Sequence, residues 1–323
     1  MSDLKQQILQ TLLNGNGESI SGDLLGKKLG VSRVAVWKHV KTLMESGHTI
    51  TSSAKGYAMV DPDDSLLPYG FPKGIQERIR YYPTLGSTMD QARELAQRST
   101  IPHMGVVVAE EQTSGRGRLN RQWISSRGGL WFTIVLFPKI PPTLSYIYNF
   151  AASLSLSETL GQLFNLDVSV KWPNDILAGH SKLCGLLSEM ETRSDMICFL
   201  IIGIGINVNN FPKADEPGAV SIREILGRKV SRRDILTRFC DTFGDTVKQI
   251  DAPDFNPSAV MHRYRKHTST IGKMVRIETF NRTDTGRALD IDDSGALLIE
   301  TPEGMTQKVI YGDCFYKSPD DPQ

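Results

Sequence analysis

The apolar pattern of the chain changes twice between its ends, and these changes limit the possible architecture more than any other feature. Residues 1–62 carry apolar positions at helical spacing, followed by short alternating runs. Residues 71–269 alternate between apolar runs and helical patterns, whereas residues 270–323 show strand patterns alone. The sequence therefore predicts a multidomain α+β protein, in which the acidic, Pro-containing residues 63–70 form a linker.

The first domain is predicted to contain three helices and a hairpin. The helices follow "LKQQILQTLLNG", "SGDLLGKKLG" and "VSRVAVWKHVKTLMESG", with Ser21 and Ser32 as N-caps of the second and third. The segment "HTITSSAKGYAMV" then predicts two short strands around a turn at Lys55-Gly56. This order is typical of a winged helix-turn-helix, whose recognition helix would lie in a DNA major groove.

The outward face of the third helix indicates DNA contact. Trp37 is the strongest indication, because an outward Trp is costly unless it meets a partner. The alternative is a helical hairpin that packs on the next domain, with its lysines in water. The candidate DNA-binding residues are Ser21, Ser32, Arg33, Val34, Trp37, Lys38, Lys41 and Lys55.

The two later domains differ in their predicted secondary structure. In the central domain, "MGVVVAEE", "GLWFTIVLFP", "VSVKWPND" and "MICFLIIGIGINV" predict strands. Helices are predicted at "STMDQARELAQRS", "LSYIYNFAASLSLSETLGQLF", "SRRDILTRFCDTFGDTVKQI" and "NPSAVMHRYRKH". The last domain has strand patterns at "MVRIETF", "TGRALDI", "GALLIET" and "QKVIYG", which favour a small β-barrel or sandwich.

Composition excludes several classes of protein. With 37 basic and 36 acidic residues, the net charge of +1 argues against coating nucleic acid through bulk charge. The four cysteines are scattered without a metal-ligand spacing, which is typical of reduced intracellular thiols. No signal-peptide pattern and no apolar stretch of about 18 residues are present. We expect a cytoplasmic protein with no membrane partner.

The segment "QTSGRGRLNRQWISSRG", residues 112–128, combines arginines with a flexible backbone and contains no acidic residue. Glycines free backbone N–H groups to point at an anion, and arginines add fork-shaped donors for carboxylate or phosphate. The spacing is neither a Walker A loop nor a GxGxxG turn. The residues alone predict a loop that orders over an anionic small molecule; an exposed basic loop and a nucleic-acid contact are the alternatives.

Two further clusters lie at strand ends. In "VKWPNDILAGHSKLCGLLSEM", residues 170–190, Asn174 and Asp175 offer oxygens for a metal or a ribose, and Lys182 begins an apolar strand. In "IIGIGINVNN", residues 201–210, glycines within a strand suggest close approach of a ligand or backbone. None of the usual catalytic triads is present and the histidines do not cluster. This combination suits catalysis by positioning and charge neutralisation, as in attack on a phosphate.

Taken together in order, these segments resemble biotin protein ligases. The similarity rests on "STMDQA", "GRGRLNRQW", "KWPND", "KLCGLLSE" and "GIGINV", in matching order and spacing. With the winged helix in front, the chain is similar to the bifunctional form that is also the biotin operon repressor. The resemblance implies a mixed α/β ligase domain and a C-terminal SH3-like β-barrel.

The resemblance also implies a two-step reaction with ATP and Mg²⁺. Biotin's carboxylate attacks the α-phosphorus of ATP to give biotinyl-5′-AMP and pyrophosphate. A lysine of a biotin carboxyl carrier domain, in acetyl-CoA or pyruvate carboxylase, then attacks the mixed anhydride. The bound adenylate would act as corepressor, promoting a homodimer through a sheet edge near residues 190–200 that binds operator DNA. Avidity from two winged helices would compensate for weak binding by one.

Site residues are carried over by position from the resemblance. Lys182 and Arg118 are expected to be catalytic, and Asp175 is the candidate Mg²⁺ ligand. The expected biotin-binding residues are Ser87, Thr88, Met89, Gln112, Gly115, Arg116, Gly117, Arg118, Trp123, Lys182, Gly185 and Leu187. The expected nucleotide-binding residues are Arg118, Trp123, Asn174, Asp175, Asn207 and Phe211. A second ordering loop is expected at residues 211–221.

Three alternatives stay open at this point. A lipoate-type acyl-adenylate ligase would use the same chemistry, although "GRGR", "KWPND" and the winged helix favour biotin. A biotin-sensing repressor without ligase activity would not require Lys182 and Arg118, and both are present. A ligase that has lost DNA binding is disfavoured by the intact residues 21–60.

Overall fold

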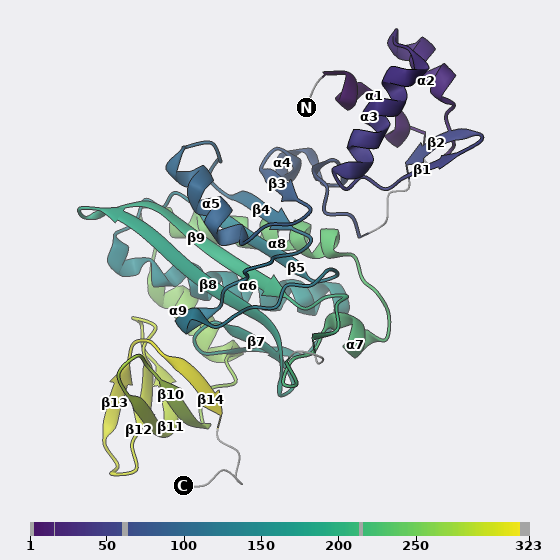
Figure 1. The fold of residues 1–323 in the computed structure, drawn as a ribbon. Helices are drawn as coiled ribbons and strands as arrows, with labels where there is room; N and C mark the ends of the chain where they lie inside the picture. The colour runs from purple at the N-terminus through teal and green to yellow at the C-terminus, as the bar shows by residue number, and fades with distance from the viewer. Residues whose placement is uncertain (1–2, 16, 60–63, 213–215, 317–323) are drawn as a thin grey trace. The chain divides into compact units, whose positions relative to one another are not determined.

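In the computed structural model, the chain is described over residues 3–15, 17–59, 64–212 and 216–316 (Figure 1). It divides into two compact units, residues 1–72 and 73–323. The domain boundaries expected from the sequence are finer than this division and remain predictions.

The N-terminal unit has the predicted three helices and hairpin. Its elements are α1 (Asp3–Leu13), α2 (Gly22–Leu29), α3 (Arg33–Glu45), β1 (Ile50–Ser53), β2 (Gly56–Met59) and the 3-10 helix η1 (Pro68–Gly70). Both predicted N-caps are confirmed, because Ser21 Oγ accepts from Leu24 N at 3.1 Å and Ser32 Oγ accepts from Ala35 N at 3.2 Å. The core of the unit contains residues of all three helices and the hairpin, including Ile8, Leu25, Val36, Val40, Leu43 and Met59.

The second unit is built on a seven-stranded mixed sheet of order β3-β4-β5-β9-β8-β7-β6. The strands are β3 (Ile79–Tyr82), β4 (Gly105–Ala109), β5 (Leu130–Leu136), β6 (Val168–Lys171), β7 (Asp175–Ala178), β8 (Ser181–Arg193) and β9 (Met196–Ile206). Only β3 and β4 pair in parallel among these described strands. The four strands predicted from their apolar runs are confirmed, as is the strand expected to begin at Lys182, which is β8; β3 and β7 are additions.

Helices cover the sheet on both faces. They are α4 (Lys73–Gln76), α5 (Thr88–Gln97), α6 (Tyr146–Phe164), α7 (Ile222–Leu226), α8 (Arg232–Ile250) and α9 (Pro257–His267), with 3-10 helices η2 (Arg118–Asn120) and η3 (Pro142–Leu144). On one face α5 packs Met89 and Ala92 against Val107 and Val135. On the other face Phe239 of α8 meets Phe132 of β5 edge to face, with 5.6 Å between ring centroids. The four helices predicted for this domain are confirmed.

The outer strands of this sheet are β3 and β6, so β8 and β9 are not edge strands over their full length. Strand β7 pairs with β8 only as far as Gly185, and β5 pairs with β9 only down to Leu200. The ends of β8 and β9 near residues 190–200 therefore project as a two-stranded ribbon beyond their neighbours (Figure 1). This ribbon is where the sequence predicts a dimer contact.

The C-terminal strands form a separate five-stranded antiparallel sheet of order β13-β12-β11-β10-β14. Its strands are β10 (Met274–Glu278), β11 (Thr283–Ile291), β12 (Leu297–Glu300), β13 (Thr306–Val309) and β14 (Asp313–Tyr316). The four predicted strands are confirmed, and β14 is an addition. No described helix is long and apolar enough to cross a membrane.

Candidate active site and DNA-binding surface

A cavity of about 1020 Å³ lies in the second unit, where the ends of β6, β8 and β9 meet the arginine-containing loop and β14. Its size lies near the upper end of the roughly 300–1,000 Å³ that is typical of small-molecule sites. Most of the expected ligand residues line it: Ser87, Thr88, Met89, Gln112, Arg116, Gly117, Arg118, Trp123, Asn174, Asp175, Lys182, Gly185 and Leu187. Gly115, Asn207 and Phe211 are not among the lining residues.

One end of the cavity is organised by the N-terminus of α5. The amide and hydroxyl of Thr88 both donate to Gln112 Oε1, at 2.8 and 3.0 Å. Gln112 Nε2 in turn donates to Ser125 Oγ at 2.8 Å. Ser87 caps α5 by accepting from the amide of Met89 at 3.2 Å. These bonds fix Gln112 across the base of the loop, so that its amide orders the loop ends around the cavity.

The indole of Trp123 lies on two glycines that face each other across β8 and β9. A Cβ at Gly205 would come within 2.4 Å of Trp123 Nε1, and one at Gly185 within 2.9 Å of the same ring. Gly185 and Gly205 are direct partners in the ladder. The strand glycines noted in the sequence therefore leave room for an aromatic side chain. Trp123 Nε1 is buried against the strand at Gly205, without a hydrogen-bond partner in the described residues.

The other end of the cavity is strongly charged. Lys182 Nζ lies 3.1 Å from Asp175 Oδ1 and 5.1 Å from the centre of the Trp123 ring. Arg118 Nη1 donates to Asn174 Oδ1 at 3.2 Å, and its Nε lies 3.7 Å from Asp313. Burial lowers the pKa of Arg118, and the charge of Asp313 opposes that shift. Two cationic side chains, each beside a carboxylate, thus lie at this end of the cavity.

Carboxylates hold the arginine loop in place. Arg121 Nη1 lies 3.1 Å from Asp313, the acid that also faces Arg118. Arg116 reaches Asp90 of α5 at 2.5 Å. Neither acid could be assigned from the sequence, because both meet the loop only through the folding of distant segments. Asp313, Phe315 and Tyr316 line the cavity from β14, the strand that the apolar pattern failed to predict.

The second expected ordering loop, residues 211–221, forms backbone hydrogen bonds with Lys182. The Lys182 amide donates to Gly218 O at 2.8 Å, and Val220 N donates to Lys182 O at 2.9 Å. Ser221 then caps α7 in a capping box with Glu224. Residues 213–215 of this loop lie outside the described residues. Any movement of residues 216–220 would therefore act directly on the strand position of Lys182.

Two expected nucleotide contacts lie elsewhere. Asn207 is 4% exposed and its Oδ1 accepts from Asn210 Nδ2 at 2.9 Å, so this amide is used inside the protein. Phe211 is 58% exposed and stacks under the guanidinium of Arg223 at 4.7 Å. Both assignments came from the resemblance and remain predictions that this arrangement does not support.

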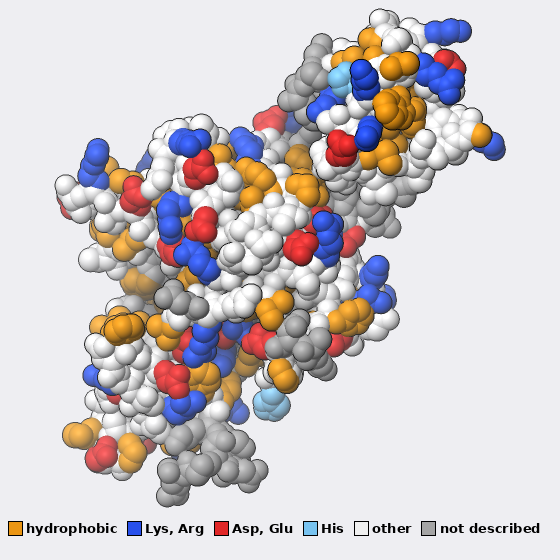
Figure 2. All heavy atoms as spheres, in the orientation of Figure 1, with side chains coloured by type: hydrophobic (Ala, Val, Ile, Leu, Met, Phe, Trp, Pro, Cys, Tyr) orange, Lys and Arg blue, Asp and Glu red, His pale blue; other side chains and the backbone are white. Residues whose placement is uncertain are grey.

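The expected DNA-binding residues gather on the N-terminal unit, where Figure 2 shows basic and apolar side chains together on the visible face. Trp37 and Val34 of α3 are 51% and 62% exposed. Lys41 Nζ lies 5.8 Å above the Trp37 ring. The remaining candidates Arg33, Lys38 and Lys55 are also exposed, whereas Ser21 and Ser32 act as helix caps. An exposed aromatic flanked by cations is suited to contact a polyanion.

Comparison with known sequences defines the class of protein. A sequence model described as "Biotin/lipoate A/B protein ligase family" matches residues 81–207. A model described as "HTH domain" matches residues 5–58, and one described as "Biotin protein ligase C terminal domain" matches residues 270–317. The chain thus joins a protein ligase domain of the biotin/lipoate class to a helix-turn-helix domain.

Relatives that span the whole chain define the family. The chain is 33% identical to "Bifunctional ligase/repressor BirA" of Bacillus subtilis, over 96% of this chain and 97% of that protein. It is 26% identical to the protein of the same name from Escherichia coli, over 95% of each. A solved structure titled "Biotin protein ligase from Aquifex aeolicus in complex with biotin and ATP" superposes with a TM-score of 0.64 and 27% identity, covering 75% of this chain and 99% of that one. The chain belongs to the bifunctional ligase/repressor family.

Proposed function

We propose that this protein activates biotin with ATP, transfers it to a lysine of a carrier domain, and represses transcription when the activated biotin is bound. The observation that carries the enzymatic part is the meeting of Lys182, Arg118 and Trp123 in one cavity with the capped N-terminus of α5. The DNA-binding part rests on the exposed face of α3.

The first step brings two anions together. An oxygen of the biotin carboxylate attacks the α-phosphorus of ATP, and the bond to pyrophosphate breaks. Lys182, whose side chain is 28% exposed, lines the charged end of the cavity and would neutralise charge on the carboxylate and α-phosphate. Arg118 would hold the adenylate so that water does not reach the labile anhydride. In the second step a carrier lysine attacks the acyl carbon and AMP leaves.

The uncharged part of the cavity suits biotin. Ser87 and Thr88 supply hydroxyls beside the buried Met89, Gly185 lies below the Trp123 ring, and Leu187 also lines the cavity. An apolar cavity lined by a few polar side chains matches the ring system of biotin, which has a ureido group at one end. The lipoate alternative is disfavoured by the whole-chain relatives, because these are ligase/repressors.

Mg²⁺ is compatible with this site only as an ion carried by the nucleotide. The described residues contain no group of three His, Cys, Asp or Glu side chains that could hold a metal by themselves. Mg²⁺ commonly binds through one or two carboxylates together with substrate phosphates. Asp175 offers one carboxylate at the charged end of the cavity, and a bound ion would neutralise phosphate charge there.

The remaining assignments are also proposals. We infer that the C-terminal sheet is an SH3-like barrel, and that the carrier belongs to acetyl-CoA or pyruvate carboxylase. The adenylate would promote a homodimer through the projecting ribbon of β8 and β9, and the dimer would bind operator DNA. A liganded protein that stayed monomeric in sedimentation experiments at micromolar concentration would contradict the dimer.

The enzymatic proposal is tested by transfer of radiolabelled biotin to a carrier domain in the presence of ATP and Mg²⁺. Lys182→Ala should slow this transfer because it slows adenylate formation, the first step. The expected reduction is about 10²–10³-fold, the size seen when an enzyme loses a donor that stabilises charge in the transition state. Lys139→Ala, which removes an exposed lysine away from the cavity, should change nothing. Unchanged transfer by Lys182→Ala would keep the ligase and remove this role. Biotin binding without transfer by the unmodified protein would indicate a sensor-repressor.

A further inference from the structure

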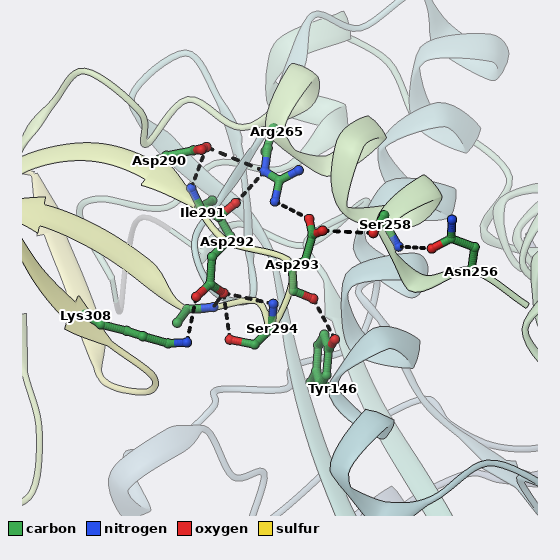
Figure 3. Close-up of polar contacts among 11 residues, drawn as sticks. Tyr146, Asn256, Ser258, Arg265, Asp290, Ile291, Asp292, Asp293, Ser294 and Lys308 are labelled. Carbon is green, nitrogen blue, oxygen red and sulfur yellow. Dashed lines mark hydrogen bonds and ion pairs between the residues drawn. The ribbon is translucent and has the colours of Figure 1, made fainter.

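The turn between β11 and β12 leaves the C-terminal sheet and packs against helices of the ligase domain (Figure 3). We call residues 292–295 the docking turn. Tyr146 of α6 donates to the carbonyl of Asp293 at 2.7 Å. Ser258 and Arg265, both on α9, donate to the Asp293 carboxylate at 2.8 and 2.5 Å. One aspartate therefore receives hydrogen bonds from two helices of the other domain.

The end of the docking turn fits closely against the ligase domain. Gly295 has a φ of +77°, and a Cβ there would lie 2.4 Å from the ring of Phe150. The Gly295 carbonyl accepts a 2.9 Å hydrogen bond from Trp172 Nε1. The Trp172 side chain is 1% exposed, so this indole has no water as an alternative partner. The turn and Trp172 must therefore keep a fixed relative position.

Trp172 belongs to the segment that carries the polar groups of the cavity. Its amide donates to Thr270 Oγ1 at 2.9 Å, and the same hydroxyl lies 2.9 Å from the hydroxyl of Tyr316. Asn174 and Asp175 are separated from Trp172 only by Pro173, and they meet Arg118 and Lys182 respectively. A displacement of Trp172 would move these groups, because the short segment 172–175 connects them.

The docking turn does not touch the cavity itself. None of residues 292–295 is among the cavity-lining residues, and the contacts of Asp293 are made to α6 and α9. The same domain contributes Asp313, which faces Arg118 and Arg121. The turn is thus placed to hold Trp172, whose amide shares the Thr270 hydroxyl with Tyr316 of β14, at the charged end. The end at Thr88 and Gln112 is formed within the ligase domain.

We propose that the docking turn positions the charged half of the cavity, with Asp293 as its principal positioning residue. The inference rests on the proposed function only in naming ATP as the ligand of that half. Loss of the Asp293 contacts would loosen Trp172, segment 172–175 and the Arg118 site together. Biotin binding at the other end would be affected much less.

The test compares Asp293→Ala with Arg282→Ala in the full-length protein. Arg282 forms an ion pair with Asp284 inside the C-terminal domain, at 3.0 Å, and serves as the matched control. The Asp293 carboxylate is 60% exposed, so its ion pair is screened by water. Asp293→Ala should therefore raise the KM for ATP in adenylate formation by about 3–5-fold. The KM for biotin should change by less than about twofold, because its site lacks these contacts. Asp293→Asn, which keeps an acceptor oxygen, should recover part of the loss.

Hydrogen exchange of the ligand-free protein gives a readout that does not depend on activity. The amides of Trp172, Asn174 and Asp175 and those of residues 116–121 should exchange about 3–5-fold faster in Asp293→Ala than in the control, since local opening would become easier. Equal rises in both KM values, or unchanged exchange at these amides, would overturn the proposal. If the unmodified protein forms no adenylate, the proposed function fails and the exchange result still decides this inference. If Asp293→Ala does not fold, Tyr146→Phe and Ser258→Ala each remove one contact and should change exchange in the same direction.

Discussion

The cavity and the outer face of α3 both concentrate positive charge, but they hold it in different ways. In the cavity, Arg118 and Arg121 share Asp313, and Lys182 meets Asp175. On α3, Lys38 is exposed and has no ion-pair partner among the described residues, while the Lys41–Glu45 pair is a surface contact at 4.0 Å. Charges fixed by carboxylates in a partly buried site can recognise the shape of one small anion. Charges left in water suit a polyanion that is recognised along its length.

The largest effect that would sharpen this comparison is expected at Arg118. Arg118→Ala removes a guanidinium that is 22% exposed and leaves Asp313 with Arg121 alone. Release of biotinyl-5′-AMP should accelerate by about 10²-fold, because truncation of a partly buried charged partner costs roughly 2–5 kcal/mol. The release rate can be followed by displacement with unlabelled ligand in low and moderate salt. It should depend little on salt, since partly buried pairs are weakly screened.

A control and a contrary result are both accessible for Arg118. Binding of biotin without ATP should be nearly unchanged, because Thr88 and Gln112 form that end of the cavity independently. If the variant releases adenylate at the rate of the unmodified protein, the ordered positive charge of the cavity does not retain the adenylate.

A smaller effect is expected at His48, a buried imidazole that has no carboxylate partner among the described residues. His48 is 7% exposed, stacks on Tyr69 with 5.3 Å between ring centroids, and its Nδ1 has no hydrogen-bond partner in the described structure. Burial lowers the pKa of His48 to about 4. The folded unit keeps this imidazole neutral, whereas the unfolded chain takes up a proton below pH 6.5. Stability should therefore be retained above pH 6.5 and decline as the pH falls toward 4.

This loss of stability can be measured by hydrogen exchange of the α3 amides, after correction for the pH dependence of the intrinsic exchange rates. Between pH 7 and 5 the free energy of opening should fall by about 1–2 kcal/mol, as the linkage of one shifted histidine predicts. His48→Phe should remove most of this pH dependence, and His39→Phe, at a partly exposed position of α3, should keep it. An equally steep decline in His48→Phe would mean that other groups control the acid sensitivity of this unit.

The fold was largely predictable from the sequence because most elements have local signals. The caps Ser21 and Ser32 and the long apolar runs of β5 and β9 identify their elements without any tertiary information. Strand β14 was missed because "DCFY" is short and begins with an acid, so it has no alternating pattern.

The site was predictable only in part, because several of its contacts join distant segments and have no local signal in the sequence. The arginine loop indicates an anion, but biotin and Lys182 were assigned through the family resemblance. Asp313 and Trp172's contact with Gly295 arise from packing between distant segments, and no local pattern reports them. Asn207 remains a prediction, and its side-chain oxygen accepts a hydrogen bond from the buried side chain of Asn210, which no local pattern indicates.

The smallest predicted effect concerns the exposed positive charge on α3. Lys38→Ala removes one exposed cation from α3 without a change in packing, because its side chain is not part of the core. Operator affinity should fall modestly, and the slope of log affinity against log salt should decrease by about 1 for one lost phosphate contact. The slope can be measured by fluorescence anisotropy with the liganded protein over a salt series, with Lys5→Ala of α1 as the control. If the affinity falls but the slope does not, Lys38 does not meet a phosphate, and its charge acts in a fixed, partly desolvated contact like those of the cavity.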